Sequence, residues 1–314
     1  MTNEDPITRR RLMLGATATG LMSLPVSACS QQTQFTEGEP MSAQERDTAW
    51  WDDAYANGAY IPNAQRFYTQ WVEDAAAFRA EAGQRAEVDL AYGPGVRNAM
   101  DLILPEGTPK GLAVFVHGGY WLQTDKSMWS HLVRGAVKAG WAGLVPSYTL
   151  APDARLAQMT QEVARAIRLA ATRVAGPVRI SGHSAGGHLA MRMACADKPL
   201  GDLTNRLEVL LGISGLYDLR PLMKTSMNLE LRIDDAEAKA ESPALLQPVS
   251  GIEAVSWVGG DERPEFIRQS KLLVEAWEGL SPTPALVIDD GFHHFDVIAG
   301  LSEPESPITR RWLG

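Results

Sequence analysis

The chain has 314 residues, 45% of them hydrophobic and 21% charged, which is the composition of an ordinary globular protein with one large core. The formal net charge is −9, and no block of lysine or arginine occurs after the first dozen residues. Binding to a phosphate backbone needs a concentrated basic face, so we expect no nucleic acid partner and a small-molecule ligand instead.

Residues 1–28 are predicted to be an export signal. Residues 8–12 read TRRRL, a twin-arginine pattern, and a short stretch of small, uncharged residues follows. Residues 26–29 read VSAC, which resembles a bacterial lipobox in which Cys29 is acylated; the alternative is a plain signal peptide cut near Ala28. We therefore expect an exported protein of the periplasm or cell envelope, in contact with the membrane only through an acyl chain on Cys29.

Residues 29–45 are polar and lack periodicity, which is typical of a flexible tether, and the folded domain is expected to occupy residues 46–314. Two cysteines are too few for a disulfide framework. The second, Cys195, lies in an apolar helical run, where we expect a buried and unreactive thiol.

Strand-like and helical stretches alternate along this domain. Strands are predicted at 86–92, 99–104, 112–117, 142–146, 178–181, 209–213, 254–258 and 285–288. Helices are predicted at 127–139, 155–174, 185–196 and 265–277. This alternation predicts an α/β fold with a mostly parallel sheet covered by helices on both faces. Residues 217–248 interrupt the rhythm with short helical pieces, and we expect them to form a small cap over the site.

The strongest chemical signal is the run VRISGHSAGGHLA at 178–190. An apolar strand leads into Gly-x-Ser-x-Gly and then into a helix of small residues, which is the setting of a serine nucleophile on a sharp turn. Ser184 is the predicted nucleophile. The backbone N–H of Ala185, at the start of the helix, is expected to face the developing oxyanion.

A second signal lies upstream, where a strand ends in the glycine-rich turn HGGYW at 117–121. Such a turn supplies further N–H donors to an oxyanion hole. We expect Gly119 and Tyr120 to donate and Gly118 to permit the bend, with His117 making structural hydrogen bonds.

A serine nucleophile needs a base, and hydrolases of this type carry serine, carboxylate and histidine in that chain order. After Ser184 the histidines are His188, His293 and His294. His188 belongs to the nucleophile helix and is expected to face the packing. His294 follows the last predicted strand and is the predicted base, and His293 either lines the pocket or is exposed.

The carboxylate that orients the base is predicted to be Asp261, because it follows a strand and two glycines that let it turn inward. Glu262 adjoins the same loop and is the alternative. The other rivals are Asp218, Asp289 and Asp290. Of these, Asp218 is expected to brace the cap.

With these motifs in place, the chain resembles the kynurenine formamidase (arylformamidase) group of α/β-hydrolases, relatives of the hormone-sensitive-lipase-like esterases. The matching segments are HGGYW (117–121), YTLAP (148–152), GHSAGGHL (182–189), GGDE (259–262) and HFD (294–296). The likeness extends from about residue 50 to residue 301.

The resemblance implies hydrolysis of an N-formyl arylamine such as N-formylkynurenine to formate and the free amine, through a formyl-enzyme and without a cofactor. No metal is implied, and the sequence has no histidine–carboxylate cluster with metal-ligand spacing. Tyr120, Trp121 and His293 are expected to shape the substrate pocket.

The export signal departs from the group, whose formamidases work in the cytoplasm, so the substrate can have changed. A broad carboxylesterase acting on small aryl or alkyl esters is the first alternative. A catalytically silent, membrane-tethered binding protein is the second. The sequence does not determine the oligomeric state.

Overall fold

The computed structural model describes residues 46–280 and 284–314. The predicted export signal and tether, Cys29 included, lie outside the described residues. Among the helices of the described ranges, none combines the length and the apolar character that crossing a bilayer requires.

The described strands form one eight-stranded sheet in the order β1-β2-β4-β3-β5-β6-β7-β8. Their bounds are β1 Ala86–Ala91, β2 Ala99–Ile103, β3 Leu112–Val116, β4 Ala142–Pro146, β5 Val178–His183, β6 Leu207–Ile213, β7 Glu253–Gly259 and β8 Ala285–Asp289. β1 pairs antiparallel with β2, and β2 pairs antiparallel with β4, whereas every pairing from β4 to β8 is parallel. The predicted mostly parallel sheet is confirmed, and each strand overlaps its predicted range.

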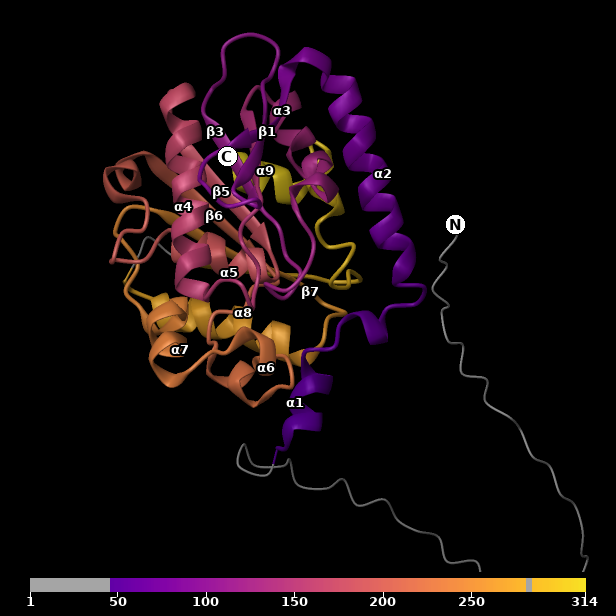
Figure 1. The fold of residues 1–314 in the computed structure, drawn as a ribbon, viewed down its shortest axis with the longest axis vertical. Helices are drawn as coiled ribbons and strands as arrows, with labels where there is room; N and C mark the ends of the chain where they lie inside the picture. Colours follow the sequence, from indigo (N-terminus) through magenta and orange to yellow (C-terminus); the bar gives the residue numbers. More distant parts are fainter. Residues whose placement is uncertain (1–45, 281–283) are drawn as a thin grey trace, which may run out of the picture. The chain divides into compact units, whose positions relative to one another are not determined.

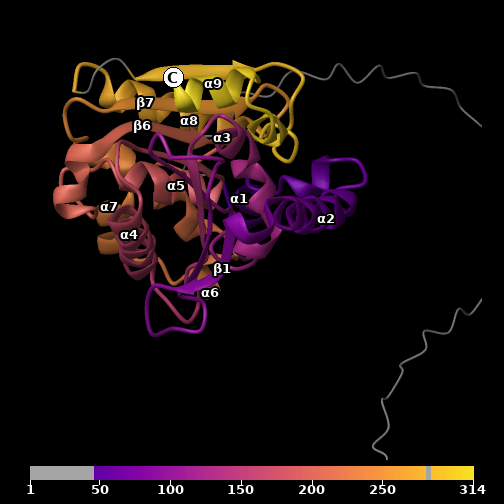
Figure 2. The ribbon, with the colours of Figure 1, turned by 90° about the horizontal axis from the view of Figure 1, so that it is seen from above.

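Helices cover both faces of the sheet, as predicted (Figures 1 and 2). Their bounds are α1 Thr48–Ala54, α2 Gln65–Ala82, α3 Arg134–Lys138, α4 Leu156–Arg173, α5 Ala185–Arg192, α6 Asn228–Leu231, α7 Asp235–Glu241, α8 Pro264–Trp277 and α9 Pro307–Leu313. α4, α5 and α8 pack on one face of the sheet, and α2, α3 and α9 pack on the other. Figure 2 shows α2 and α4 on opposite sides.

The strand β3 shows why its sequence is apolar throughout. All five of its residues are buried. Leu112, Val114 and Val116 belong to the core under α4 and α5, and Ala113 and Phe115 belong to the core under α2 and α3. A central strand of a parallel sheet is covered on both faces, so each of its positions has to be apolar.

Two predicted helices end or break earlier than expected, because other groups take their backbone partners. Residues 127–139 form two 3₁₀ turns before α3, since the carbonyl of Ser127 accepts from Arg79 Nη1 at 2.6 Å instead of from a helical amide. α5 ends at Arg192 because the next residues pair with residues 247–249. There, Ala196 N donates to Gln247 O, and Val249 N donates to Ala194 O.

Residues 217–248 contain the predicted short helical pieces, including α6 and α7. Buried polar contacts hold this insertion on the neighbouring helices. Glu241 accepts from Thr160 Oγ1 of α4 at 2.7 Å and from Arg192 Nε of α5 at 3.0 Å. Trp277 Nε1 of α8 donates to Pro243 O at 3.0 Å. The insertion is therefore fixed against α4, α5 and α8.

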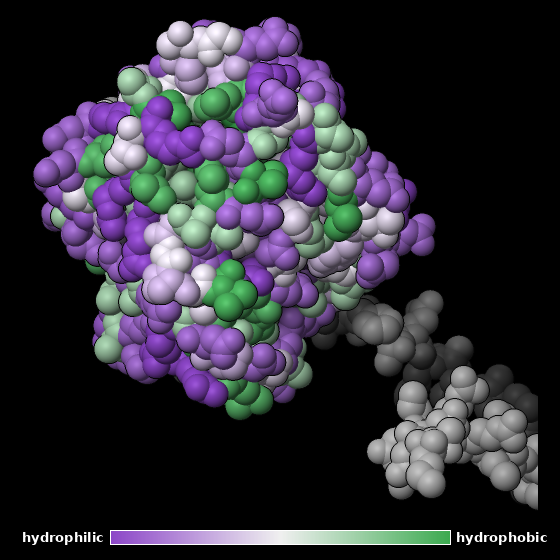
Figure 3. Space-filling view, turned by 45° about the horizontal axis from the view of Figure 1, so that its top comes forward, coloured by the Kyte–Doolittle hydropathy of each residue, from purple (hydrophilic) through white to green (hydrophobic). Residues whose placement is uncertain are grey.

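The surface drawn in Figure 3 carries hydrophobic residues in small groups that lie between hydrophilic ones. A mixed surface of this kind is usual for a globular protein, and only large contiguous apolar patches point to docking.

Candidate active site

Ser184 lies on the sharp turn between β5 and α5, with φ 57° and ψ −121°. This backbone conformation is strained for a residue with a side chain and is characteristic of functional positions. The flanking glycines permit it. A Cβ on Gly182 would lie 2.1 Å from the carbonyl oxygen of Gly186, and one on Gly186 would lie 2.0 Å from that of Val116. The motif therefore needs glycine on both sides for packing as well as for the turn.

The glycine-rich loop after β3 lies directly against Ser184. A Cβ on Gly118 would lie 3.0 Å from the Cβ of Ser184. Gly119 (φ 111°) and Tyr120 (φ 54°) both have left-handed backbone conformations. Within the described part of the chain, the N–H groups of Gly119, Tyr120 and Ala185 have no hydrogen-bond acceptor. These are the N–H groups that the sequence predicted as oxyanion donors, and they are free to bind one.

Buried side chains hold this loop in place. Thr124 Oγ1 donates to Gly118 O at 2.8 Å, and Tyr148 Oη donates to His117 O at 2.9 Å. The His117 ring stacks on the Tyr148 ring, with 4.4 Å between centroids. Burial lowers the pKa of His117 to about 4, so this imidazole is neutral near pH 7. The structural role predicted for His117 is confirmed.

Tyr120 links the loop to the segment between α1 and α2. Its hydroxyl donates to Tyr55 O at 2.8 Å. Burial raises the pKa of Tyr120 to about 12, which keeps this donor protonated. The strained backbone of Tyr120 is therefore anchored through the end of its own side chain.

His294 is buried, and its Nδ1 lies 2.6 Å from Glu262 Oε2. Glu262 Oε1 accepts from Ser214 Oγ at 2.5 Å and from Gly259 N at 2.9 Å, and the side chain has no exposed surface. A buried carboxylate on Nδ1 fixes the tautomer whose Nε2 can accept a proton. Glu262 is thus placed as the residue that orients His294.

The prediction of Asp261 as this residue is wrong in the structure. Asp261 is exposed, and its backbone N donates to Phe292 O at 3.0 Å. That pairing fixes the loop so that the next side chain turns inward, and the extra methylene of Glu262 lets its carboxylate reach back to Gly259 and His294. The adjacent alternative, Glu262, takes the position.

His183 braces the base from the nucleophile's own strand. Its Nε2 lies 2.9 Å from the carbonyl oxygen of His294, and the centroids of the two imidazole rings are 4.5 Å apart. A carbonyl only accepts, so Nε2 carries the proton. Burial, and then the neighbouring His294, lower the pKa of His183 well below its usual value. This neighbour is therefore neutral and does not repel a protonated His294.

Comparison with known proteins identifies the family. Residues 113–259 match the family model described as the alpha/beta hydrolase fold. A solved structure of a proposed thioesterase from Silicibacter sp. TM1040 is 45% identical, with a TM-score of 0.80, and the match covers 84% of this chain and 98% of that one. The chain belongs to the α/β-hydrolase family.

Curated relatives of the hydrolase include kynurenine formamidases. The protein from Salmo salar is 27% identical over 248 residues, which cover 75% of this chain and 83% of that one. The protein from Drosophila melanogaster is 27% identical over 237 residues, covering 70% and 78%. The likeness predicted from the motifs is confirmed, and the hydrolase is an enzyme of the serine hydrolase type. An esterase from Pyrobaculum calidifontis shares the fold at 16% identity, with a TM-score of 0.61 and coverage of 78% and 90%.

A small cavity of about 30 Å³ opens beside Ser184. The residues that line it are Tyr68, Trp71, Gly118, Gly119, Tyr120, Gln123, Thr124, Trp129, His183, Ser184, His294 and Phe295. It thus brings together the nucleophile, the base and the glycine-rich loop, and α2 supplies Tyr68 and Trp71. Among the described residues that line it, none belongs to the insertion at 217–248, and α2 together with neighbouring loops forms its wall instead.

The three residues that were predicted to line the substrate pocket lie in three different places. Tyr120 lines the cavity. His293 lines a neighbouring groove of about 240 Å³, which also borders Glu262 and His294. Trp121 is fully buried and packs edge-on against His188, with 5.2 Å between ring centroids, so its prediction as a pocket residue is wrong.

The remaining candidates have structural partners. His188 is buried, its Nε2 lies 2.6 Å from Glu241 O, and burial lowers its pKa to about 3. Asp218 pairs with Arg220 at the start of the insertion, at 2.9 Å. Asp289 accepts from Trp257 Nε1 at 3.1 Å. Cys195 is buried as predicted, and burial raises its pKa to about 12.

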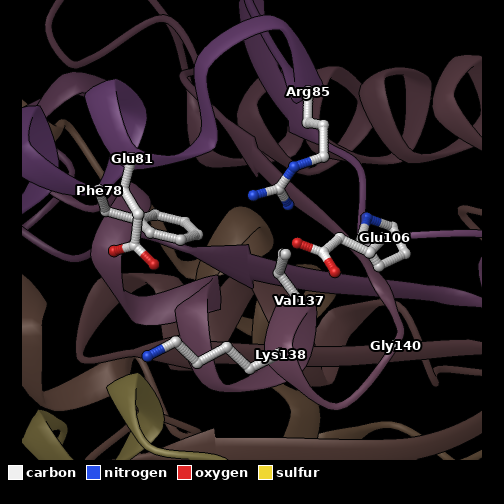
Figure 4. A pocket seen from close by; sticks show the side chains of 8 residues that line it. Phe78, Glu81, Arg85, Glu106, Val137, Lys138 and Gly140 are labelled. Carbon is white, nitrogen blue, oxygen red and sulfur yellow. The ribbon is translucent and has the colours of Figure 1, made fainter.

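A larger cavity of about 270 Å³ lies between α2, α3 and the loop after β2 (Figure 4). Figure 4 shows the Arg85 and Glu106 side chains pointing toward each other across it. Its lining holds charged residues of both signs, Lys138 and Glu81 among them, and no serine, cysteine or histidine. Its lining has no group suited to acyl transfer, whereas the lining of the cavity at Ser184 has a serine and a histidine.

Proposed function

We propose that the hydrolase removes the formyl group from an N-formyl arylamine. One observation carries the proposal: the cavity at Ser184 has room for only a very small acyl group. The cavity beside the glycine-rich loop measures about 30 Å³, room for roughly two or three water-sized atoms. The acyl part of an N-formyl arylamine is a single carbon with its oxygen, the smallest acyl group that a substrate can carry. The likeness to kynurenine formamidases supports this choice.

The first half of the reaction forms a formyl-enzyme. Ser184 Oγ attacks the formyl carbon while His294 Nε2 takes the hydroxyl proton, and Glu262 stabilises the imidazolium that results. The negative charge moves to the formyl oxygen, where the N–H groups of Gly119, Tyr120 and Ala185 can bind it. The C–N bond then breaks, and the departing amine takes the proton from His294.

The second half releases formate. His294 Nε2 takes a proton from water, and the hydroxide attacks the formyl carbon of the ester on Ser184. The bond from carbon to Oγ breaks, Ser184 takes a proton from His294, and formic acid leaves and ionises to formate in water. The protons in this sequence pass between Ser184, His294, the amine and water, so the proposed reaction needs no cofactor.

A carboxylesterase acting on small aryl or alkyl esters is the second candidate. The same small cavity fits an acetyl group, and the relative that is 45% identical is described as a proposed thioesterase. The arrangement of Ser184, His294 and Glu262 argues against a silent binding protein. Labelling of Ser184 by a fluorophosphonate probe tests that alternative, which predicts no labelling.

The deciding experiment compares kcat/KM of the purified protein on N-formylkynurenine and on p-nitrophenyl acetate, with Ser184→Ala as the control. We expect the formamide to be the better substrate and the control to be inactive on both. Turnover of the ester with negligible cleavage of the formamide would reassign the enzyme as an esterase.

We also propose that the enzyme is exported to the periplasm or cell envelope and anchored to the membrane through Cys29. The support is the sequence of residues 1–29. Cys29→Ser should release the protein from membranes into the soluble periplasmic fraction, which fractionation and immunoblotting would detect. An unchanged membrane fraction in this variant would contradict lipid anchoring.

A further inference from the structure

The wall of the cavity at Ser184 is made largely of aromatic side chains. Tyr68 and Trp71 come from α2, Trp129 from the turns before α3, and Phe295 from the loop that carries His294. We propose that Trp71 limits the length of the acyl group that the enzyme accepts. This inference rests on acyl transfer at Ser184, as in the proposed function, and names a residue that selects the acyl part of the substrate.

Trp71 is the centre of this wall. Its ring centroid lies 4.6 Å from that of Trp129, 5.3 Å from that of Tyr68 and 5.3 Å from that of Phe295. Only 7% of its surface is exposed. An indole that is packed on three sides by other rings has no free rotamer into which it can retreat, so it closes the cavity as a fixed surface.

The helix behind Trp71 is also fixed. Arg79, two turns further along α2, donates through Nη1 to Ser127 O at 2.6 Å and to Ser130 Oγ at 2.9 Å. Trp129 in turn packs toward Phe115 of β3, with 6.3 Å between centroids. The wall therefore rests on the central sheet, and a longer acyl chain cannot enter by a small shift of α2.

The position of the cavity identifies it as the acyl side of the site. Its floor is the glycine-rich loop, in which the N–H groups of Gly119 and Tyr120 are free to bind the carbonyl oxygen of the scissile bond. The leaving group has to lie next to the base, because His294 protonates it. The acyl carbon, in contrast, becomes bonded to Ser184 Oγ, and Ser184 lines this cavity, so the acyl substituent has to occupy the space that Trp71 closes.

The test is the acyl-length profile on p-nitrophenyl acetate, butyrate, hexanoate and octanoate. In the natural protein we expect kcat/KM to fall about tenfold or more from acetate to hexanoate, since each misfitting methylene costs a substantial factor. Trp71→Ala removes the wall, and its hexanoate-to-acetate ratio should rise by about tenfold or more. A ratio is used because it does not depend on the fraction of folded enzyme.

Phe67→Ala is the matched control. Phe67 lies one turn before Trp71 in the same cluster, 6.0 Å from Trp71 and 5.8 Å from Phe295, but it does not line the cavity. Its loss should leave the ratio at the natural value. Trp71→Leu and Trp71→Phe provide smaller openings if the alanine variant does not fold, and fluorophosphonate labelling identifies the variants with a formed site.

An unchanged ratio in a labelled Trp71 variant would overturn the inference, and so would a natural protein that prefers hexanoate. An equal change of the hexanoate-to-acetate ratio in Phe67→Ala would overturn the inference as well, because loosened packing of the aromatic cluster would then explain the change in both variants. The proposed function fails separately: if N-formylkynurenine is not cleaved while Trp71 variants still shift the ester profile, the formamide assignment is refuted and the acyl limit stands.

Discussion

Replacing Glu262 with glutamine tests the assignment of the carboxylate that orients His294. Glutamine keeps a carbonyl oxygen for Ser214 Oγ and Gly259 N, which Glu262 Oε1 binds at 2.5 and 2.9 Å. It replaces the oxygen 2.6 Å from His294 Nδ1 by an NH₂ group. A flipped amide would set its NH₂ against the N–H of Gly259, so the geometry selects the orientation with nitrogen toward His294.

The amide N–H then donates to Nδ1 of His294, which puts the ring proton on Nε2. In that tautomer Nε2 cannot accept the proton of Ser184, and no carboxylate stabilises the imidazolium. The matching loss of the carboxylate in serine proteases lowers kcat by about 10⁴-fold. For Glu262→Gln we expect a fall of about 10³–10⁴-fold, or roughly 4–5 kcal/mol in the activation free energy.

The assay is kcat on p-nitrophenyl acetate for the natural protein, Glu262→Gln and Asp261→Asn. Asp261 is exposed and makes no contact with His294 among the described residues, so its variant should stay within about threefold of the natural kcat, as surface changes usually do. Circular dichroism confirms that the variants are folded. A Glu262→Gln enzyme within tenfold of the natural rate, or an Asp261→Asn enzyme as damaged as expected for Glu262→Gln, would refute the assignment.

Three further predictions follow from single contacts. Gly118→Ala would place a Cβ 2.8 Å from the carbonyl oxygen of His183, so the loop must shift, and kcat/KM on p-nitrophenyl acetate should fall about 100-fold or more; near-natural turnover would contradict the tight approach. Tyr120→Phe removes the hydroxyl that donates to Tyr55 O at 2.8 Å, so kcat should drop several-fold with little change in KM, and an unchanged kcat would show that the anchor is dispensable. Burial lowers the pKa of His131 in the folded protein to about 4, compared with 6.5 in the unfolded chain. As the pH falls from above 6.5 toward 4, the unfolded chain binds a proton that the folded protein does not, so the free energy of unfolding decreases. Between pH 7.5 and 5.5, the free energy of unfolding of His131→Gln, measured with urea, should therefore fall by on the order of 1 kcal/mol less than that of the natural protein. An identical pH slope in the two proteins would contradict a buried neutral imidazole.

The catalytic side chains that depend on local pattern could be predicted from the sequence. The strand before Ser184 and the small residues around it specify the turn, because a Cβ at Gly182 or Gly186 would collide with backbone carbonyls. The strands were predictable for the same kind of reason, since β3 has to be apolar at every position to be covered on both faces.

The orienting carboxylate could not be chosen from the sequence, because Asp261 and Glu262 are neighbours on one loop. The choice depends on a long-range contact in which Asp261 N donates to Phe292 O. Nothing within residues 259–262 encodes the position of Phe292. The break in the helix predicted at 127–139 has a similar origin, because Arg79 is distant in sequence and takes the carbonyl of Ser127.

The wall of the substrate cavity was the part of the site least accessible from the sequence. The aromatic residues of α2 predict packing against something larger, but they do not indicate that Trp71 reaches the nucleophile. The insertion at 217–248 was the expected cover because it interrupts the pattern of strands and helices. Its polar groups are instead used in holding it to α4 and α5.

Because α2 contributes to the cavity, the residues that select the acyl group and the residues that carry the reaction lie in different parts of the sequence. Ser184 and the glycine-rich loop lie within residues 113–259, the span shared with the family model, whereas Tyr68 and Trp71 lie before it. Substitutions on α2 can therefore change which acyl group the enzyme accepts, while the residues that react with the substrate stay the same. A library confined to this helix would therefore be a direct engineering route from short acyl substrates to longer ones.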